Sequence, residues 1–245
     1  MSGHNKWSKI KNVKAANDAA NSKVYSKLGR EITVAVKLGG PDPNSNPRLK
    51  TVIAKARAVN MPNDNITRNI KKASGEDANI NYDSITYEGY GVSGSAVMVY
   101  ALTDNKNRTA SDVRHLFDKF GGSLGATGCV NYLFDRKGVI VVEKGRGISD
   151  DDMMMYALDA GADDVEINDD CFVIYTAPDA FENVKKYFDD NKIEYAEADL
   201  DMVPQNYVSL PADKIATFQK FLNALDDNDD VQNVYHNVDN LPEEE

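Results

Sequence analysis

The residue types that most often perform catalysis or bind metals are few and scattered in this chain. Its three histidines, His4, His115 and His236, lie far apart and lack the spacing of zinc ligands. The cysteines Cys129 and Cys171 have no CxxC spacing, so buried thiols are expected rather than a disulfide or a metal site. No Gly-x-Ser-x-Gly or metal-hydrolase motif is present. The sequence predicts a protein without catalytic residues, metal, cofactor or small-molecule substrate.

A glycine-rich run at residues 121–128 (Gly-Gly-Ser-Leu-Gly-Ala-Thr-Gly) is the segment most similar to a phosphate-binding loop. It lacks the Gly-Lys-Ser/Thr ending of such loops and follows a predicted helix rather than a strand. A flexible helix-to-strand connection is therefore the favoured interpretation. Contact between its backbone amides and RNA stays open.

Aromatic and basic residues are combined in the polar segment at residues 1–20, which has little apolar periodicity. Trp7 lies among Lys6, Lys9, Lys11 and Lys14. A ring in such an arm can stack on a nucleic-acid base, or it can pack the arm onto a neighbouring helical core. Both interpretations remain open from the sequence.

A second polar group surrounds the start of a predicted helix near residue 109. Asn107, Arg108 and Arg114 lie there, and backbone N–H groups at a helix start can receive a phosphate. A capped helix with exposed arginines explains the same residues. Thr109 and Asp112 have the spacing of a capping box, which predicts that the helix opens at Thr109.

Charge is divided unevenly along the chain, although the net charge is −11. Residues 1–72 contain 15 Lys and Arg against four acids, whereas residues 73–245 contain 13 Lys and Arg against 35 acids. Clustered cations bind polyanions by releasing counterions from a phosphate backbone. The pattern predicts a basic nucleic-acid-binding module joined to an acidic body that would repel the same polyanion.

The basic module is predicted to be a bundle of three short helices. Apolar residues recur at helical spacing in three stretches. The first follows a candidate N-cap at Ser22 and ends at Gly39-Gly40-Pro41; the third opens at Pro62. The stripes are Val24, Leu28, Ile32 and Ala35; Leu49, Val52, Ile53 and Ala56; and Ile66 and Ile70. Most basic residues fall off these stripes, which predicts that they are free to meet a partner.

The remaining chain is predicted to form two α+β modules. Strands at 85–90 and 96–102 flank a turn, and a helix and a strand at 130–134 follow. Residues 137–203 then have the β-α-β-β-α-β order of a ferredoxin-like domain. A last helix at 211–225 and strand at 231–238 are expected to return to the earlier sheet, which makes the third module an insertion in the second.

Motifs along nearly the whole chain resemble those of the YebC/PmpR family, whose mitochondrial relatives are translational activators. The matching segments, by residue number, are 3–7 (Gly-His-Asn-Lys-Trp), 30–35 (Arg-Glu-Ile-Thr-Val-Ala), 37–40, 46–49, 60–62, 87–91 (Tyr-Glu-Gly-Tyr-Gly), 107–109 with 113–114, 121–125 and 230–235 (Asp-Val-Gln-Asn-Val-Tyr). The resemblance implies an N-terminal three-helix domain followed by two ferredoxin-like α+β domains. It also implies a DNA-binding transcriptional regulator or a ribosome-associated factor that helps translation.

We therefore expect three domains: a basic helical domain at 1–78, an α+β domain at 79–135 plus 204–240, and a ferredoxin-like domain at 136–203. We expect a cytoplasmic regulator that binds DNA or ribosomal RNA, with the ribosome as a further candidate partner and no membrane contact. The side chains expected to contact nucleic acid are Lys6, Trp7, Lys9, Lys11, Lys14, Lys23, Lys27, Arg30, Lys37, Arg48, Asn107, Arg108 and Arg114.

Two points limit this expectation. The sequence has no helix-turn-helix, RRM or KH signature, which disfavours base-specific reading of DNA and favours an RNA contact that reads shape. A protein–protein adaptor, in which the acidic modules act and the basic arm only steers the encounter, is the alternative from a different functional class.

Overall fold

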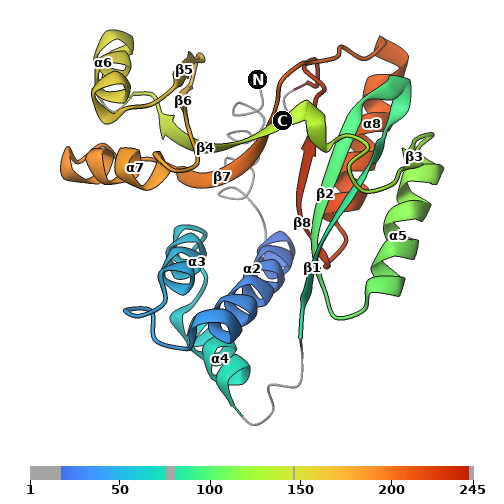
Figure 1. The fold of residues 1–245 in the computed structure, drawn as a ribbon, viewed down its shortest axis with the longest axis horizontal. Coiled ribbons are helices and arrows are strands. Elements are labelled where there is room, and N and C mark those ends of the chain that lie inside the picture. The colour runs from blue at the N-terminus through green and yellow to red at the C-terminus, as the bar shows by residue number, and fades with distance from the viewer. Residues whose placement is uncertain (1–17, 76–80, 146, 243–245) are drawn as a thin grey trace. The chain divides into compact units, whose positions relative to one another are not determined.

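A computed structural model describes residues 18–75, 81–145 and 147–242, with side chains from residue 21 onward (Figure 1). This part of the chain forms two compact units. Residues 132–207 make one unit, and the residues before and after them, up to 131 and from 208 to 241, make the other. The fold is α+β with two four-stranded antiparallel sheets, as predicted from the sequence.

Three helices form the N-terminal region of the larger unit: α2 (Asp18–Gly39), α3 (Pro47–Ala58) and α4 (Asn63–Ser74). Their apolar stripes meet in one core. The predicted N-cap at Ser22 is wrong, because the helix already begins at Asp18. Pro62 is the N-cap of α4, so the sequence signal marked that helix start to within one residue.

Asn46 joins the first two helices. Its Oδ1 accepts a hydrogen bond from the backbone N–H of Leu49, which caps α3, and its Nδ2 donates to the carbonyls of Ala35 and Gly40 at the end of α2. The side chain is 3% exposed. A Cβ on Gly39 would lie 2.7 Å from Asn46, so only glycine leaves room for this buried cap.

The sheet of the larger unit has the order β3-β1-β2-β8. Its strands are β1 (Asp83–Tyr90), β2 (Ala96–Thr103), β3 (Ser123–Leu124) and β8 (Val231–His236). A 3₁₀ turn at Val92–Gly94 closes the β1–β2 hairpin, as expected. The last strand pairs with β2, which confirms that the chain returns to this sheet after residues 132–207.

Two helices, α5 (Lys106–Lys119) and α8 (Ala212–Asp226), cover one face of this sheet (Figure 1). Phe117 from α5 packs edge-on against Phe221 from α8, with ring centroids 4.9 Å apart. Both rings are buried against Val97 and Val99 of β2. Large buried side chains of this kind supply most of the hydrophobic stabilisation of such a layer.

The smaller unit has the order β-α-β-β-α-β and the sheet β5-β6-β4-β7, which is the ferredoxin-like arrangement predicted. Its strands are β4 (Phe134–Glu143), β5 (Asp164–Ile167), β6 (Cys171–Thr176) and β7 (Glu197–Pro204). The helices α6 (Asp150–Ala160) and α7 (Phe181–Asp190) pack with it around one core.

The prediction of a separate strand at 130–134 is wrong. Residues 131–133 form a short 3₁₀ turn (Asn131–Leu133), and β4 runs without interruption from Phe134 to Glu143. The polar stretch 135–138 looks like a break in sequence, but β7 pairs with all of it. Glycine is needed at position 138, because a Cβ there would lie only 2.2 Å from the Thr176 hydroxyl.

Candidate nucleic-acid interface

One basic face of α2 contacts the acidic segment that follows α8. The ammonium of Lys23 pairs with Asp227 at 2.6 Å, and that of Lys27 donates to the Asp226 carbonyl at 2.9 Å. Arg30, one turn further along the same face, reaches the buried Asp230. The expectation that these three cations are free to meet a partner is therefore wrong, because two carboxylates and a backbone carbonyl, all distant in sequence, accept from them.

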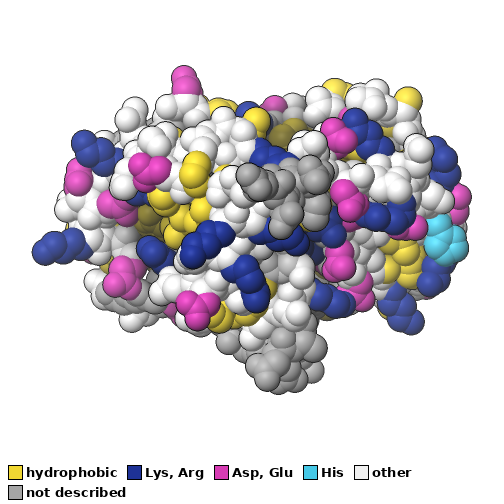
Figure 2. Space-filling view, turned by 90° about the horizontal axis from the view of Figure 1, so that it is seen from below, with side chains coloured by type: hydrophobic (Ala, Val, Ile, Leu, Met, Phe, Trp, Pro, Cys, Tyr) yellow, Lys and Arg dark blue, Asp and Glu magenta, His cyan; other side chains and the backbone are white. Residues whose placement is uncertain are grey.

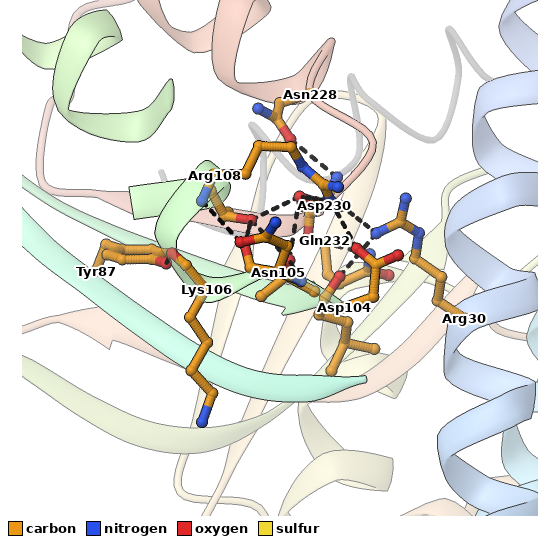
Figure 3. Close-up of polar contacts among 12 residues, drawn as sticks. Arg30, Tyr87, Asp104, Asn105, Lys106, Arg108, Asn228, Asp230 and Gln232 are labelled. Carbon is orange, nitrogen blue, oxygen red and sulfur yellow. Dashed lines mark hydrogen bonds and ion pairs between the residues drawn. The ribbon is translucent and has the colours of Figure 1, made fainter. Parts of the chain in front are cut away.

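Asp230 is the centre of this contact (Figure 3). Its carboxylate accepts from the Arg30 guanidinium through Oδ1 and from Arg108 through Oδ2 at 2.8 Å. The hydroxyl of Thr109 lies 2.6 Å from Oδ2, and that of Thr103 lies 3.3 Å away. Arg30 also donates to the Leu102 carbonyl at 2.9 Å. One carboxylate thus joins α2, the end of β2, the first turn of α5 and the start of β8.

The environment of Asp230 keeps it ionised although it is only 3% exposed. Burial by itself raises the pKa of this carboxyl, but hydrogen bonds from Arg108, Thr109 and Arg30 outweigh burial and lower its pKa to about 2. The same contacts raise the pKa of Arg108. Removing one partner of such an ion pair strongly lowers the stability of a protein, because the other charge is left buried without a partner.

The start of α5 differs from the predicted capping box. Asn105 is the N-cap, and its side chain accepts from the backbone N–H of Arg108 at 3.1 Å. Thr109 lies inside the helix and is fully buried. Asn107 and Arg114 are exposed on α5, whereas Arg108 forms ion pairs with both Asp104 and Asp230.

A buried acid of the same unit accepts hydrogen bonds from the last residue of the glycine-rich run and from two residues that follow it. Glu88, 4% exposed on β1, accepts hydrogen bonds from the backbone N–H groups of Gly128, Val130 and Asn131 at 2.7, 3.0 and 2.8 Å. These amides would be the donors in a phosphate-binding loop. The carboxylate of Glu88 fills that position, so contact of RNA with these three amides is not supported.

Several exposed cations remain on the helical region. Arg48 and Lys50 lie in the first turn of α3, Arg57 in its last turn, and Lys71 on α4. None of these four has an ion pair with a residue that the structure describes. Figure 2 shows Lys and Arg side chains spread over the face on which these helices lie, with acidic side chains between them.

A polar groove, which the sequence reasoning missed, lies beside these cations. It has a volume of about 410 Å³ and is lined by α2, α4, Tyr82 and Asp229. Of the residues expected to bind nucleic acid, Arg30 and Lys37 line it, and Lys37 donates to Asn81 Oδ1 at 2.5 Å. Arg68 and Lys72 line it as well and were not singled out. The expected contacts in the arm, Lys6, Trp7, Lys9, Lys11 and Lys14, lie outside the described residues.

In the part of the chain that the structure describes, no group of three or more His, Cys, Asp and Glu side chains is arranged to hold a metal ion. Both cysteines are free thiols; Cys171 is buried, which raises its pKa to about 12, and Cys129 is half-buried. None of the described helices combines the length and apolar character needed to cross a membrane.

Comparison with protein-family models places both parts of the chain in one family. Residues 5–76 match the model described as the TACO1/YebC protein N-terminal domain, and residues 82–238 match the TACO1/YebC second and third domain. The chain belongs to the TACO1/YebC family. This finding confirms the resemblance inferred from the motifs.

Individual members of the TACO1/YebC family are similar over almost the full chain. A protein of Acetivibrio thermocellus is 53% identical, with 97% of this chain and 98% of that protein covered. One of Clostridium botulinum is 52% identical, with 98% and 97% covered. Each is named a probable transcriptional regulatory protein. The crystal structure of a conserved hypothetical protein from Aquifex aeolicus is 44% identical, covers 94% of both chains and superposes with a TM-score of 0.85.

Proposed function

We propose that the protein is a cytoplasmic regulator of gene expression that acts by binding nucleic acid, without covalent chemistry. The observation that carries this proposal is the set of exposed cations on the helical region, Arg48, Lys50, Arg57 and Lys71, without described acidic partners. Such side chains bind phosphates and release counterions. Relatives named as probable transcriptional regulatory proteins support a regulatory role.

In this proposal the basic helical domain and the acidic α+β domains have different roles. The helical domain at 1–78 supplies affinity through phosphates, and the α+β domains at 79–135 plus 204–240 and at 136–203 carry most of the acids. Lys23, Lys27 and Arg30 contact residues 226–230 of the same chain, so we assign ligand binding to other cations. The binding surface is therefore α3, α4 and the groove, together with the basic arm and the exposed Asn107 and Arg114 of α5.

Transcription is the process that the names of the relatives favour. The alternatives from the sequence are a translation factor that binds ribosomal RNA and a protein–protein adaptor. They differ in the molecule that is held, so identifying that molecule separates them.

In-cell crosslinking of the full-length protein, followed by sequencing of the attached nucleic acid, makes this identification. The test variant carries Arg48→Glu, Lys50→Glu, Arg57→Glu and Lys71→Glu. Its matched control carries four exposed lysines outside the helical region changed in the same way, namely Lys119→Glu, Lys186→Glu, Lys214→Glu and Lys220→Glu. We expect discrete nucleic-acid targets for the wild type and the control, and their loss in the test variant.

The identity of the targets decides the finer assignment. Enrichment of promoter DNA supports transcriptional regulation, whereas enrichment of ribosomal RNA makes the protein a translation factor and the transcriptional effect indirect. If the wild type captures no nucleic acid above background, the proposal is wrong and the adaptor takes its place.

A further inference from the structure

The groove beside α2 and α4 is polar although two helices of one bundle form its walls. Helices that pack side by side normally bury apolar residues between them, and here the core contacts of α4 include Ile66 and Ile70, which do not line the groove. Tyr82, just before β1, closes one side of the groove. A volume of about 410 Å³ falls within the range of roughly 300–1,000 Å³ of small-molecule sites.

The wall made by α4 is a continuous hydrogen-bonding stripe. Asn65, Arg68, Asn69 and Lys72 follow one another at steps of three, one and three residues, so they share a face of the helix, and all four line the groove. The side chain of Asn69 lies against Gly29 of α2, 3.2 Å from the position a Cβ would occupy. Glycine at this position therefore lets Asn69 approach α2 closely.

The positive charge of this wall is not neutralised within the described chain. Arg68 donates one N–H to the neutral side chain of Asn65 at 2.8 Å, which leaves most of its five donors without a described partner. Lys72 has no hydrogen bond or ion pair with a described residue. Asp229 is the one acid among the described residues that line the groove. Two cations with unused donors on one helix face are suited to a phosphate group.

Two aromatic rings lie on the other walls. The guanidinium of Arg30, held by Asp230, lies 5.2 Å from the centre of the Tyr82 ring. The hydroxyl of Tyr25 donates to the Asn60 carbonyl at 3.0 Å, which fixes that ring at the groove. Tyrosine rings and arginine planes are the surfaces on which unpaired bases stack. The groove thus combines phosphate donors with stacking surfaces.

We propose that this groove binds one nucleotide unit of a single-stranded nucleic acid, with the phosphate at Arg68 and Lys72 and the base beside Tyr82. A cavity of this size holds one nucleotide and excludes a base-paired duplex. The proposal rests on the proposed function and deepens it, because it assigns the strand form that the helical domain takes up. A free mononucleotide has the same chemistry, and the test separates the two sources.

The test measures binding of the full-length protein to a fluorescently labelled oligo-uridine of 12 nucleotides, chosen because it forms no duplex. Lys72→Gln removes a groove cation, and Lys71→Gln removes the same charge from the adjacent residue, which does not line the groove. Arg68→Gln and Arg57→Gln form a second pair. Thermal unfolding checks that all four variants fold.

We expect Lys72→Gln and Arg68→Gln each to weaken binding at least tenfold. Lys71→Gln and Arg57→Gln change cations of the proposed binding surface that lie outside the groove, and each should weaken binding only about threefold. Each groove variant also lowers the slope of log affinity against log salt, by at most about 0.7, the value for one phosphate contact on a single strand. Equal losses in the members of each pair would show a diffuse basic surface and overturn the groove. In contrast, absence of binding by the wild type to any nucleic acid overturns the proposed function itself.

Photo-crosslinking places the base and distinguishes the sources. An oligonucleotide that carries 4-thiouridine is expected to crosslink to the peptide that contains Tyr82 or Tyr25, and Tyr82→Leu is expected to reduce affinity about tenfold. Uridine monophosphate should compete only at far higher concentration. Competition by the mononucleotide at the concentration of the oligonucleotide, or crosslinks confined to other peptides, would contradict the assignment to a strand.

Discussion

Asp230 determines what the neighbouring basic residues do. A sequence reading assigns Arg30 and Arg108 to nucleic acid, because cations in a basic segment usually bind polyanions. In the folded chain both guanidiniums reach one buried carboxylate, and Thr109 completes its hydrogen bonds. The acid is distant in sequence from all three, so no local pattern reveals the contact. Residues 226–230, at the end of α8 and just after it, contact three cations of α2.

The pH dependence of stability tests this assignment. The pKa of Asp230 is about 2, against an ordinary value of 3.8, so the folded state favours the charged carboxylate. Its contribution is complete above about pH 4 and is lost as the pH falls through about 2, on the order of 2 kcal/mol in total. Urea unfolding of the wild type and of Asp230→Asn should therefore differ most near pH 5, and the difference should shrink by about that amount towards pH 2.

The control for this experiment is Asp213→Asn, which changes an exposed carboxylate whose side chain is 71% accessible. Its difference from the wild type should be small at every pH. A wild-type advantage over Asp230→Asn that stays constant from pH 5 to about pH 2 would mean that the buried carboxylate is not held ionised.

At the scale of elements, the start of α5 offers the clearest test of local structure. Asn105 caps the helix, whereas the sequence favoured Thr109 with Asp112. Asn105→Ala should lower the free energy of unfolding by about 1 kcal/mol. Asn107→Ala, an exposed change two residues further on, should stay within about 0.5 kcal/mol. Urea denaturation measures both, and equal effects would show that Asn105 does not act as the cap.

The spacing of apolar residues and the positions of turn residues predicted nearly every helix and strand, because local sequence determines where helices and strands form. The three helical stripes, the β1–β2 hairpin and the β-α-β-β-α-β order are examples. The errors occur where a distant partner decides. The length of β4 depends on pairing with β7, and Thr109 is buried in α5 because its hydroxyl reaches Asp230. The three domain boundaries stay a prediction.

The candidate site was less predictable than the fold. The charge excess of residues 1–72 indicated the helical region, yet Lys23, Lys27 and Arg30 in it contact residues 226–230 of the same chain. Arg68 and Lys72 were missed, although the polar stripe of α4 could have revealed them: it recurs at helical spacing beside the apolar one. The sequence does not show which polar face of α4 lines a groove, because this depends on how α2 and α4 pack in the folded chain.

For the whole molecule, segregation of charge makes binding strongly dependent on salt. The basic N-terminal region holds an excess of +11 and the rest of the chain an excess of −22, so cations that contact phosphates act against repulsion from the same molecule. Added salt screens both effects, but counterion release dominates once contacts form. The affinity for nucleic acid is therefore expected to fall as salt rises.

The measurement that tests the central claim most directly is the affinity of the full-length protein for single-stranded and duplex nucleic acid as a function of salt. For whichever of the two nucleic acids is bound, the account predicts that log affinity falls linearly with log salt concentration, by roughly 0.7–0.9 for each phosphate contacted. The variant with Glu at Arg48, Lys50, Arg57 and Lys71 should lose most of both the affinity and the slope. A flat salt response, or a variant that binds like the wild type, would contradict the claim that the helical domain holds nucleic acid through its exposed cations.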